Sequence, residues 1–101
     1  MYISRLSFHT RPGKTAEVEE KLRKLLKLVL DVGGVRPRVL RTHLASEGAP
    51  DLVFEQEAPD LSTLEMQIKR VTDNPEFQRW SKQVSDLVAD SPKREVYLVV
   101  E

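Results

Sequence analysis

The chain has 101 residues, of which 40% are hydrophobic and 32% are charged. This length corresponds to a single domain, residues 1–101, and a domain of this size buries only a limited share of its surface. Sixteen Lys and Arg residues balance sixteen Asp and Glu residues, so no net charge attracts the protein to nucleic acid or to an anionic membrane. The absence of cysteine excludes disulfides, thiolate metal sites and a cysteine nucleophile.

The sequence predicts neither a secretory leader nor a membrane span. Met1 opens directly into a short strand-like run, without the positive segment and apolar stretch of a signal peptide. The apolar runs are a few residues long, whereas about 20 residues are needed to cross a bilayer. We therefore expect a cytoplasmic protein that binds neither nucleic acid nor a membrane.

The first part of the chain predicts a strand followed by a long helix. Tyr2 to His9 mixes apolar and small polar residues and ends before a turn at Arg11-Pro12-Gly13-Lys14. From Thr15, the expected N-cap, apolar residues recur every three or four positions as far as Gly33-Gly34. This apolar stripe consists of Val18, Leu22, Leu25, Leu26, Val29 and Val32. Leu28 lies off the stripe, either in a second contact surface or as an exposed leucine.

Two strands joined by a hairpin loop follow. Val35 to Ala45 carries β-branched residues and a proline near its start, which predicts an edge strand because proline lacks the N–H that a ladder needs. Ser46 to Pro50 is the expected loop, and Asp51 to Glu57 the returning strand. The sequence does not decide on which face of the sheet Arg41 and His43 lie, since a register shift of one residue moves every side chain to the other face.

Two shorter helices and a final strand complete the chain. Asp60 is expected to cap one helix and Asn74 the next, in which Pro75 takes the favoured first position. Ser91-Pro92 ends the third helix, and Glu95 to Val100 forms the closing strand. The apolar stripes are Leu61, Leu64, Ile68 and Val71 in the second helix, and Phe77, Trp80, Val84, Leu87 and Val88 in the third.

The order of these elements is β-α-β-β-α-β with an extra helix before the last strand. It predicts an α+β fold of the ferredoxin-like type, in which one antiparallel sheet carries helices on one face. The other face of the sheet then needs a partner. A small domain gains core by pairing that face with a second copy through a symmetric interface.

At these positions the chain resembles the dimeric α/β-barrel superfamily, in particular its antibiotic-biosynthesis-monooxygenase-like and NIPSNAP-like families. The turn Arg11-Pro12-Gly13-Lys14 looks like the Pro-Gly turn of those families, and Gly33-Gly34 stands at the end of the first helix as it does there. The hairpin Glu47 to Phe54 and the helix start Asn74 to Trp80 are similar to those of NIPSNAP-like members. Together these segments touch most of the chain.

The resemblance implies a homodimer whose sheets face each other and close a barrel around a cavity for a small hydrophobic or aromatic ligand. Such families include cofactor-independent monooxygenases of aromatic polyketides, haem-degrading enzymes and proteins without known activity. The haem-degrading members carry a histidine shortly after the phenylalanine of a motif like Asn74 to Phe77. Here Trp80 and Ser81 stand nearby, and no histidine follows His43. We therefore expect no haem and no other cofactor.

Polar residues in the predicted strands are candidates for the chemistry. A cofactor-free oxygenase needs groups that orient a phenolic substrate and accept its proton. Strand alternation puts Arg5 and His9 on one side of the first strand. We predict His9 and Tyr97 as catalytic residues, and Arg5, Glu55, His43 and Trp80 as ligand-binding residues. Alternatively, Arg5 and Glu55 form an ion pair that fixes dimer register in a non-catalytic ligand-binding or assembly module.

Other interpretations of the same residues are less well supported. Trp80 lies in an apolar stripe, which is typical of a core residue, and neither histidine stands in a metal-ligand spacing. An RNA-recognition domain has the same topology but needs aromatic residues on its third strand, where this chain has Leu52 to Glu57. An acylphosphatase-like enzyme needs a glycine-rich phosphate loop, and Thr10 to Lys14 has one glycine and a proline without an N–H.

Overall fold

The computed structural model describes residues 1–101 and confirms an α+β fold with an extra helix before the last strand. The elements are β1 (Tyr2–Phe8), α1 (Thr15–Asp31), β2 (Val35–Arg41), β3 (Leu52–Ala58), α2 (Leu61–Thr72), α3 (Pro75–Ser85) and β4 (Lys93–Leu98). The strands form one antiparallel sheet in the order β2-β3-β1-β4, which is the predicted ferredoxin-like arrangement.

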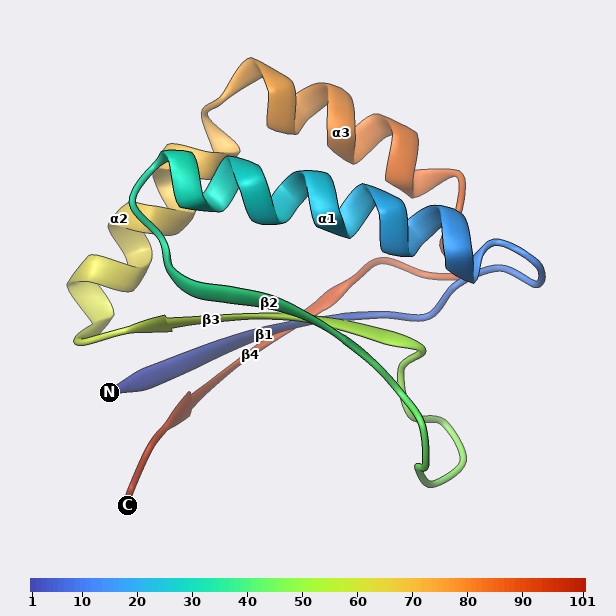
Figure 1. The fold of residues 1–101 in the computed structure, drawn as a ribbon, viewed down its shortest axis with the longest axis horizontal. Helices are drawn as coiled ribbons and strands as arrows, with labels where there is room; N and C mark the ends of the chain where they lie inside the picture. Colours follow the sequence, from blue (N-terminus) through green and yellow to red (C-terminus); the bar gives the residue numbers. More distant parts are fainter.

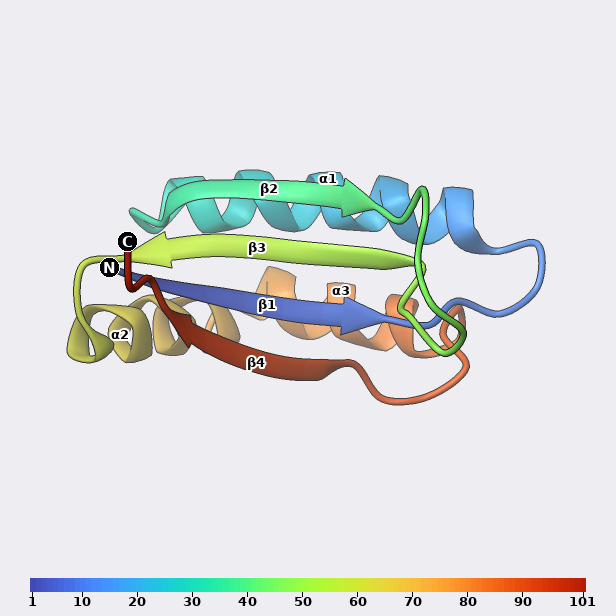
Figure 2. The same ribbon diagram turned by 90° about the horizontal axis from the view of Figure 1, so that it is seen from below.

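The helices all cover the same face of the sheet (Figure 1), which we call the covered face. Seen from below, α1 lies behind β2 and β3, whereas α2 and α3 lie behind β1 and β4 (Figure 2). No helix covers the opposite face, which we call the open face. The strand register assigns to the open face Ile3, Arg5 and Ser7 of β1, Arg38 and Leu40 of β2, Val53, Glu55 and Glu57 of β3, and Lys93, Glu95 and Tyr97 of β4.

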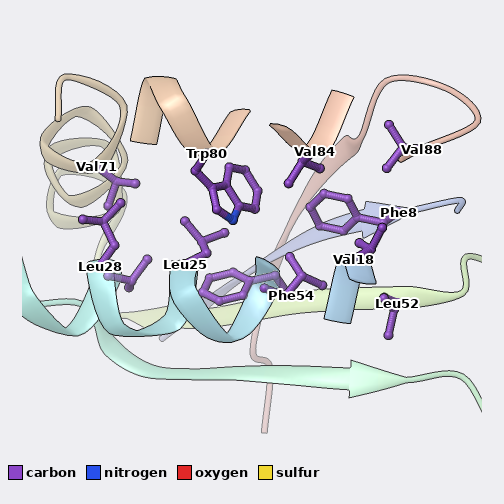
Figure 3. Packing of buried hydrophobic residues seen from close by; sticks show 12 residues of the cluster. Phe8, Val18, Leu25, Leu28, Leu52, Phe54, Val71, Trp80, Val84 and Val88 are labelled. Atoms are coloured by element: carbon purple, nitrogen blue, oxygen red, sulfur yellow. The ribbon is translucent and has the colours of Figure 1, made fainter. Parts of the chain in front are cut away.

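The hydrophobic core lies between the covered face and the helices (Figure 3). Alternation along β1 and β3 turns Phe8, Leu52 and Phe54 toward the helices, where each is at most 3% exposed. They pack against Val18, Leu22, Leu25 and Val29 of α1 and against Val71, Trp80, Val84 and Val88. The apolar stripes predicted for α1 and α3 therefore face the core, with Leu26, Val32, Phe77 and Leu87 partly buried at its margin. However, α3 ends at Ser85 and not at Ser91-Pro92 as expected, so Leu87 and Val88 follow the helix.

The burial of two leucines differs from what the apolar stripes of the helices predict. Leu28, which lies off the main stripe of α1, is buried because α2 and α3 also contact this helix; Figure 3 places it beside Val71. Leu61 was expected in the α2 stripe but is 47% exposed, because it begins the helix outside the core cluster.

The predicted cap of α1 is wrong, whereas those of α2 and α3 are confirmed. Lys14 occupies the N-cap of α1 without a side-chain hydrogen bond, and the Thr15 hydroxyl pairs with that of Thr10 at 2.6 Å. Asp60 accepts a hydrogen bond from the Thr63 N–H at 2.7 Å, and Asn74 accepts one from the Glu76 N–H at 2.9 Å. None of the helices combines the length and the apolar character that crossing a membrane requires.

The edge position predicted for β2 is confirmed, but the strand is shorter than expected. It ends at Arg41 and not at Ala45, because the chain turns into a loop in which the Thr42 N–H donates to the Asp51 carbonyl at 3.0 Å. The register also decides the facing that the sequence left open. Arg41 lies on the covered side, where its guanidinium donates to Glu19 of α1 at 2.8 and 2.9 Å, and His43 lies beyond the strand.

Strand β2 carries an irregularity at its free edge. Its pairing with β3 shifts between Val35 and Arg38, and Arg36 has a positive φ of 46° directly before Pro37. A bulge of this kind bends the strand and interrupts the row of free N–H and C=O groups that another strand would pair with.

Candidate functional site

A row of charged side chains crosses the middle of the open face. The register aligns one residue from each strand, in the order Arg38, Glu55, Arg5 and Glu95. Arg5 Nε donates to Glu55 Oε2 at 2.8 Å, and Arg38 Nε and Nη2 donate to Oε1 at 3.0 and 2.7 Å. Glu55 is 2% exposed on a face that no helix covers, because the two arginines flank it. Arg38 is the partner that the sequence argument missed.

Opposing effects set the pKa of Glu55. Burial by itself raises the pKa, because a carboxylate loses hydration energy when it leaves water. The hydrogen bonds and charges of Arg38 and Arg5 outweigh burial, so the pKa of Glu55 lies below its ordinary value. The hydrogen bond to Glu55 also raises the pKa of Arg38. Glu55 is therefore an ionised partner of two arginines at neutral pH and does not serve as a general acid.

Glu55→Gln is expected to reduce the loss in the free energy of unfolding that occurs when the pH is lowered. A carboxylate with a lowered folded-state pKa stabilises the protein above its unfolded pKa of about 4.3, and this stabilisation is lost as the pH falls through the folded value. Urea unfolding at about pH 7, 4.5 and 3 should therefore show a smaller fall in the free energy of unfolding for Glu55→Gln than for the wild type. The exposed Glu65 of α2 provides the matched control, Glu65→Gln. Equal acid dependence in Glu55→Gln and the wild type would contradict the assignment.

Tyr97 extends the charged row toward the N-terminal half of β1. The Arg5 guanidinium carbon lies 5.2 Å from the centre of the Tyr97 ring, and the Tyr97 hydroxyl donates to Glu95 Oε2 at 3.0 Å. The hydrogen bond to Glu95 and desolvation raise the pKa of Tyr97 above its ordinary value. Tyr97 therefore remains a neutral phenol at neutral pH, so it suits a hydrogen-bond donor better than a general base.

His9 lies at the far end of β1 from Tyr97. Tyr97 pairs with Ile3, and the six residues from Ile3 to His9 correspond to about 20 Å along a strand. The His9 ring is held at the hairpin loop, where Nε2 is 3.1 Å from the Gly48 carbonyl and Nδ1 is 3.5 Å from Asp90 Oδ1. Within one chain the structure does not bring the two predicted catalytic residues together.

His43 and Trp80 also lie apart from the charged row. His43 lines a surface hollow in the loop after β2, together with Arg41 and Asp51. Trp80 is 8% exposed in the core on the covered side, and its Nε1 donates to the Lys21 carbonyl at 2.6 Å. Of the residues predicted for the site, the structure thus groups Arg5, Glu55 and Tyr97. The chain contains no cluster of three His, Cys, Asp or Glu side chains suited to a metal ion.

A second candidate site, on the covered side of the sheet, was not predicted. A narrow cavity of about 30 Å³, partly open to solvent, is lined by apolar residues of β1, β3 and the three helices, together with Gln56, Thr72 and Arg94. Arg94 Nη1 donates to the hydroxyl of Ser4, which is 1% exposed. Ser4, Gln56 and Arg94 occupy strand positions that alternate with open-face residues. A polar residue at the inward positions of three strands was the sequence signal for this site.

Comparison with solved structures places this fold among known proteins. A candidate antibiotic biosynthesis monooxygenase from Nitrosomonas europaea superposes with a TM-score of 0.73 at 16% identity, covering all of both chains. A NIPSNAP domain protein from Burkholderia xenovorans superposes with a TM-score of 0.75 at 15% identity, covering 99% of this chain and 95% of the other. A candidate antibiotic biosynthesis monooxygenase from Deinococcus radiodurans superposes with a TM-score of 0.71 at 15% identity, covering 100% of this chain and 94% of the other.

The sequence matches no protein-family model and no curated protein. Likeness at 15 or 16% identity shows the fold, and the activities in the names of those proteins remain theirs. The chain has the fold of these antibiotic biosynthesis monooxygenase and NIPSNAP domain proteins, the fold that the resemblance in its sequence predicted.

Proposed function

We propose that the chain is a homodimeric small-molecule-binding protein of oxygenase-like type, in which two open faces meet and enclose a ligand cavity. The observation that carries this proposal is the open face itself, a four-stranded surface without a covering layer. A sheet normally packs one face against another layer to form a core, and two copies related by symmetry supply that layer to each other.

The composition of the open face is compatible with burial in a dimer. Apolar side chains flank the charged row, with Leu40 and Val53 on one side and Ile3 and Tyr97 on the other. Leu40 and Tyr97 are 39% and 43% exposed in the single chain. The carboxylate of Glu55 already has two cationic partners, so pairing the faces leaves it compensated.

The proposed ligand is a small hydrophobic or aromatic molecule with a polar oxygen. Tyr97 offers a phenol that can turn from Glu95 to a ligand oxygen, and Arg5 offers a cation beside the aromatic ring. A cofactor-independent oxygenase reaction on such a ligand is the catalytic form of this proposal. Arg5 and Tyr97 already form hydrogen bonds with Glu55 and Glu95 of the same chain. These bonds favour the alternative, a binding or assembly role without turnover.

Native mass spectrometry of protein purified without added ligands tests the assembly. We expect a species of twice 11.6 kDa, with any retained ligand visible as added mass. Val53→Lys places a charge in the open face and should yield monomers, whereas Gln78→Lys on the exposed surface of α3 should stay dimeric. A monomeric wild type, or a dimeric Val53→Lys protein, would contradict the proposal. Oxygen uptake by the wild type with a hydroquinone separates the catalytic form from the binding form.

A further inference from the structure

We propose that the charged row sets the orientation of the two open faces in the dimer, because Arg38 of each subunit pairs with Glu95 of the partner subunit. This inference rests on the proposed dimer and goes beyond it, since it names the contact that selects one arrangement of the two sheets. It follows from how the charges are paired within one chain and from the order of their signs across the sheet.

The charges of the row are unevenly paired within one chain. Glu55 accepts hydrogen bonds from both Arg5 and Arg38, so one carboxylate serves two guanidinium groups. Glu95 takes part in no salt bridge, and its side chain accepts a hydrogen bond from the Tyr97 hydroxyl. The row therefore has a surplus positive charge over β2, β3 and β1, and an unpaired negative charge on the edge strand β4.

Burial between two sheets leaves Glu95 without a contacting cation in its own chain. A carboxylate that leaves water needs a cationic partner, because the hydration energy that it loses is otherwise not replaced. Arg38 of the other subunit can be that partner. Its side chain is 51% exposed, and its Nε and Nη2 bind Glu55, whereas its Nη1 forms no hydrogen bond within the chain. Sheets packed face to face lie about 10 Å apart, a separation that an arginine and a glutamate side chain bridge together.

The order of the signs across the sheet fits a two-fold axis parallel to the strands. Figure 2 shows the strands in the order β2, β3, β1 and β4. Along this order the row alternates in sign, as Arg38, Glu55, Arg5 and Glu95. Such an axis reverses the strand order in the partner, so Arg38 faces the partner's Glu95 and Glu55 faces the partner's Arg5. Every charge of the row then lies opposite a charge of the other sign.

A two-fold axis along the row is the other way to stack the two sheets with aligned strands. It places each residue of the row opposite its own copy, so that Arg38 faces the partner's Arg38 and Glu95 faces the partner's Glu95. Like charges that oppose each other weaken an interface, and complementary charges fix its orientation. The row therefore favours the first arrangement and disfavours the second.

Cross-linking between single cysteines tests the orientation directly. The chain has no cysteine of its own, so Arg38→Cys and Glu95→Cys each carry one. After subunit exchange in an equimolar mixture, we expect a bismaleimide that spans about 10 Å, the distance between stacked sheets, to join the two variants. Either variant alone should not be cross-linked, because its two cysteines then lie at opposite edges of the stacked sheets, offset by about 14 Å across the strands.

Glu95→Gln tests the strength of the contact. Glutamine keeps an acceptor for the Tyr97 hydroxyl but removes the charge that faces the partner's Arg38. We expect the dissociation constant of the dimer to rise by about 10- to 100-fold, because symmetry removes two charge-assisted contacts at once. Sedimentation equilibrium measures this constant. The matched control is Glu65→Gln on the exposed surface of α2, which should leave the constant unchanged.

Failure of this inference can be told apart from failure of the proposed dimer. A monomeric wild type would contradict both. With a dimeric wild type, cross-linking of Arg38→Cys or Glu95→Cys alone would indicate the opposite stacking and overturn this inference. An absence of cross-links in the mixture would overturn it too, as would a dissociation constant that Glu95→Gln lowers or leaves unchanged. Each of these results leaves the dimer itself standing.

Discussion

Replacing Trp80 by alanine is expected to lower the free energy of unfolding by about 3 to 5 kcal/mol, the usual cost of removing a large buried aromatic side chain. The ring stacks on Phe77 at a centroid distance of 5.4 Å and meets Phe8 edge to face at 6.5 Å. Its indole N–H also joins α3 to the Lys21 carbonyl of α1. The free energy of unfolding of a native domain is about 5 to 15 kcal/mol, so this loss is a large share of it. Trp80→Ala should therefore lower the thermal midpoint by more than about 10 °C.

The conservative variant Trp80→Phe serves as the control. It keeps an aromatic ring beside Phe77 and loses the hydrogen bond to Lys21, so we expect a loss of about 1 to 2 kcal/mol. Thermal unfolding followed by circular dichroism measures both variants. An unchanged midpoint in Trp80→Ala, together with weaker binding of a ligand, would return Trp80 to the ligand-binding role predicted from the sequence.

Gly34→Ala is expected to destabilise the connection between α1 and β2 by about 2 to 3 kcal/mol, as overpacking does in a closely packed site. A Cβ atom at Gly34 would lie 2.2 Å from Val29 Cγ1 and 2.8 Å from the Val29 carbonyl oxygen. The Gly34 N–H also donates to that carbonyl at 2.8 Å, so the backbone cannot withdraw without losing a hydrogen bond. Urea unfolding measures the loss.

Gly13→Ala separates this steric effect from the cost of backbone conformation. Gly13 has a φ of +76°, but nothing lies within 4 Å of an added Cβ, so only the left-handed conformation is penalised, by about 1 kcal/mol. In Val29→Ala/Gly34→Ala the contact with Val29 Cγ1 disappears while that with the carbonyl remains. We therefore expect the Gly34→Ala cost to shrink in the Val29→Ala background, and strictly additive losses would contradict the steric explanation.

The candidate site was predictable in part. Alternation along the strands placed Arg5 and Glu55 on one face, and their contact follows from the register of β1 and β3. Arg38 was missed because the bulge in β2 shifts its register, and sequence periodicity does not reveal a bulge. The distance between His9 and Tyr97 depends on which residues of β1 and β4 pair, which neither strand encodes alone.

The sequence by itself determined the order and type of the elements, the caps at Asp60 and Asn74 and the edge position of β2. These features depend on contacts between residues close together in the chain, such as hydrogen bonds within one helical turn and the missing N–H of Pro37. Only the tertiary structure decided that Glu55 has two arginine partners, that Leu28 and Trp80 belong to the core, and that Arg94 lines a cavity beside Ser4. Those outcomes depend on strand register and on how the helices pack over the sheet, which bring together residues as far apart as Ser4 and Arg94.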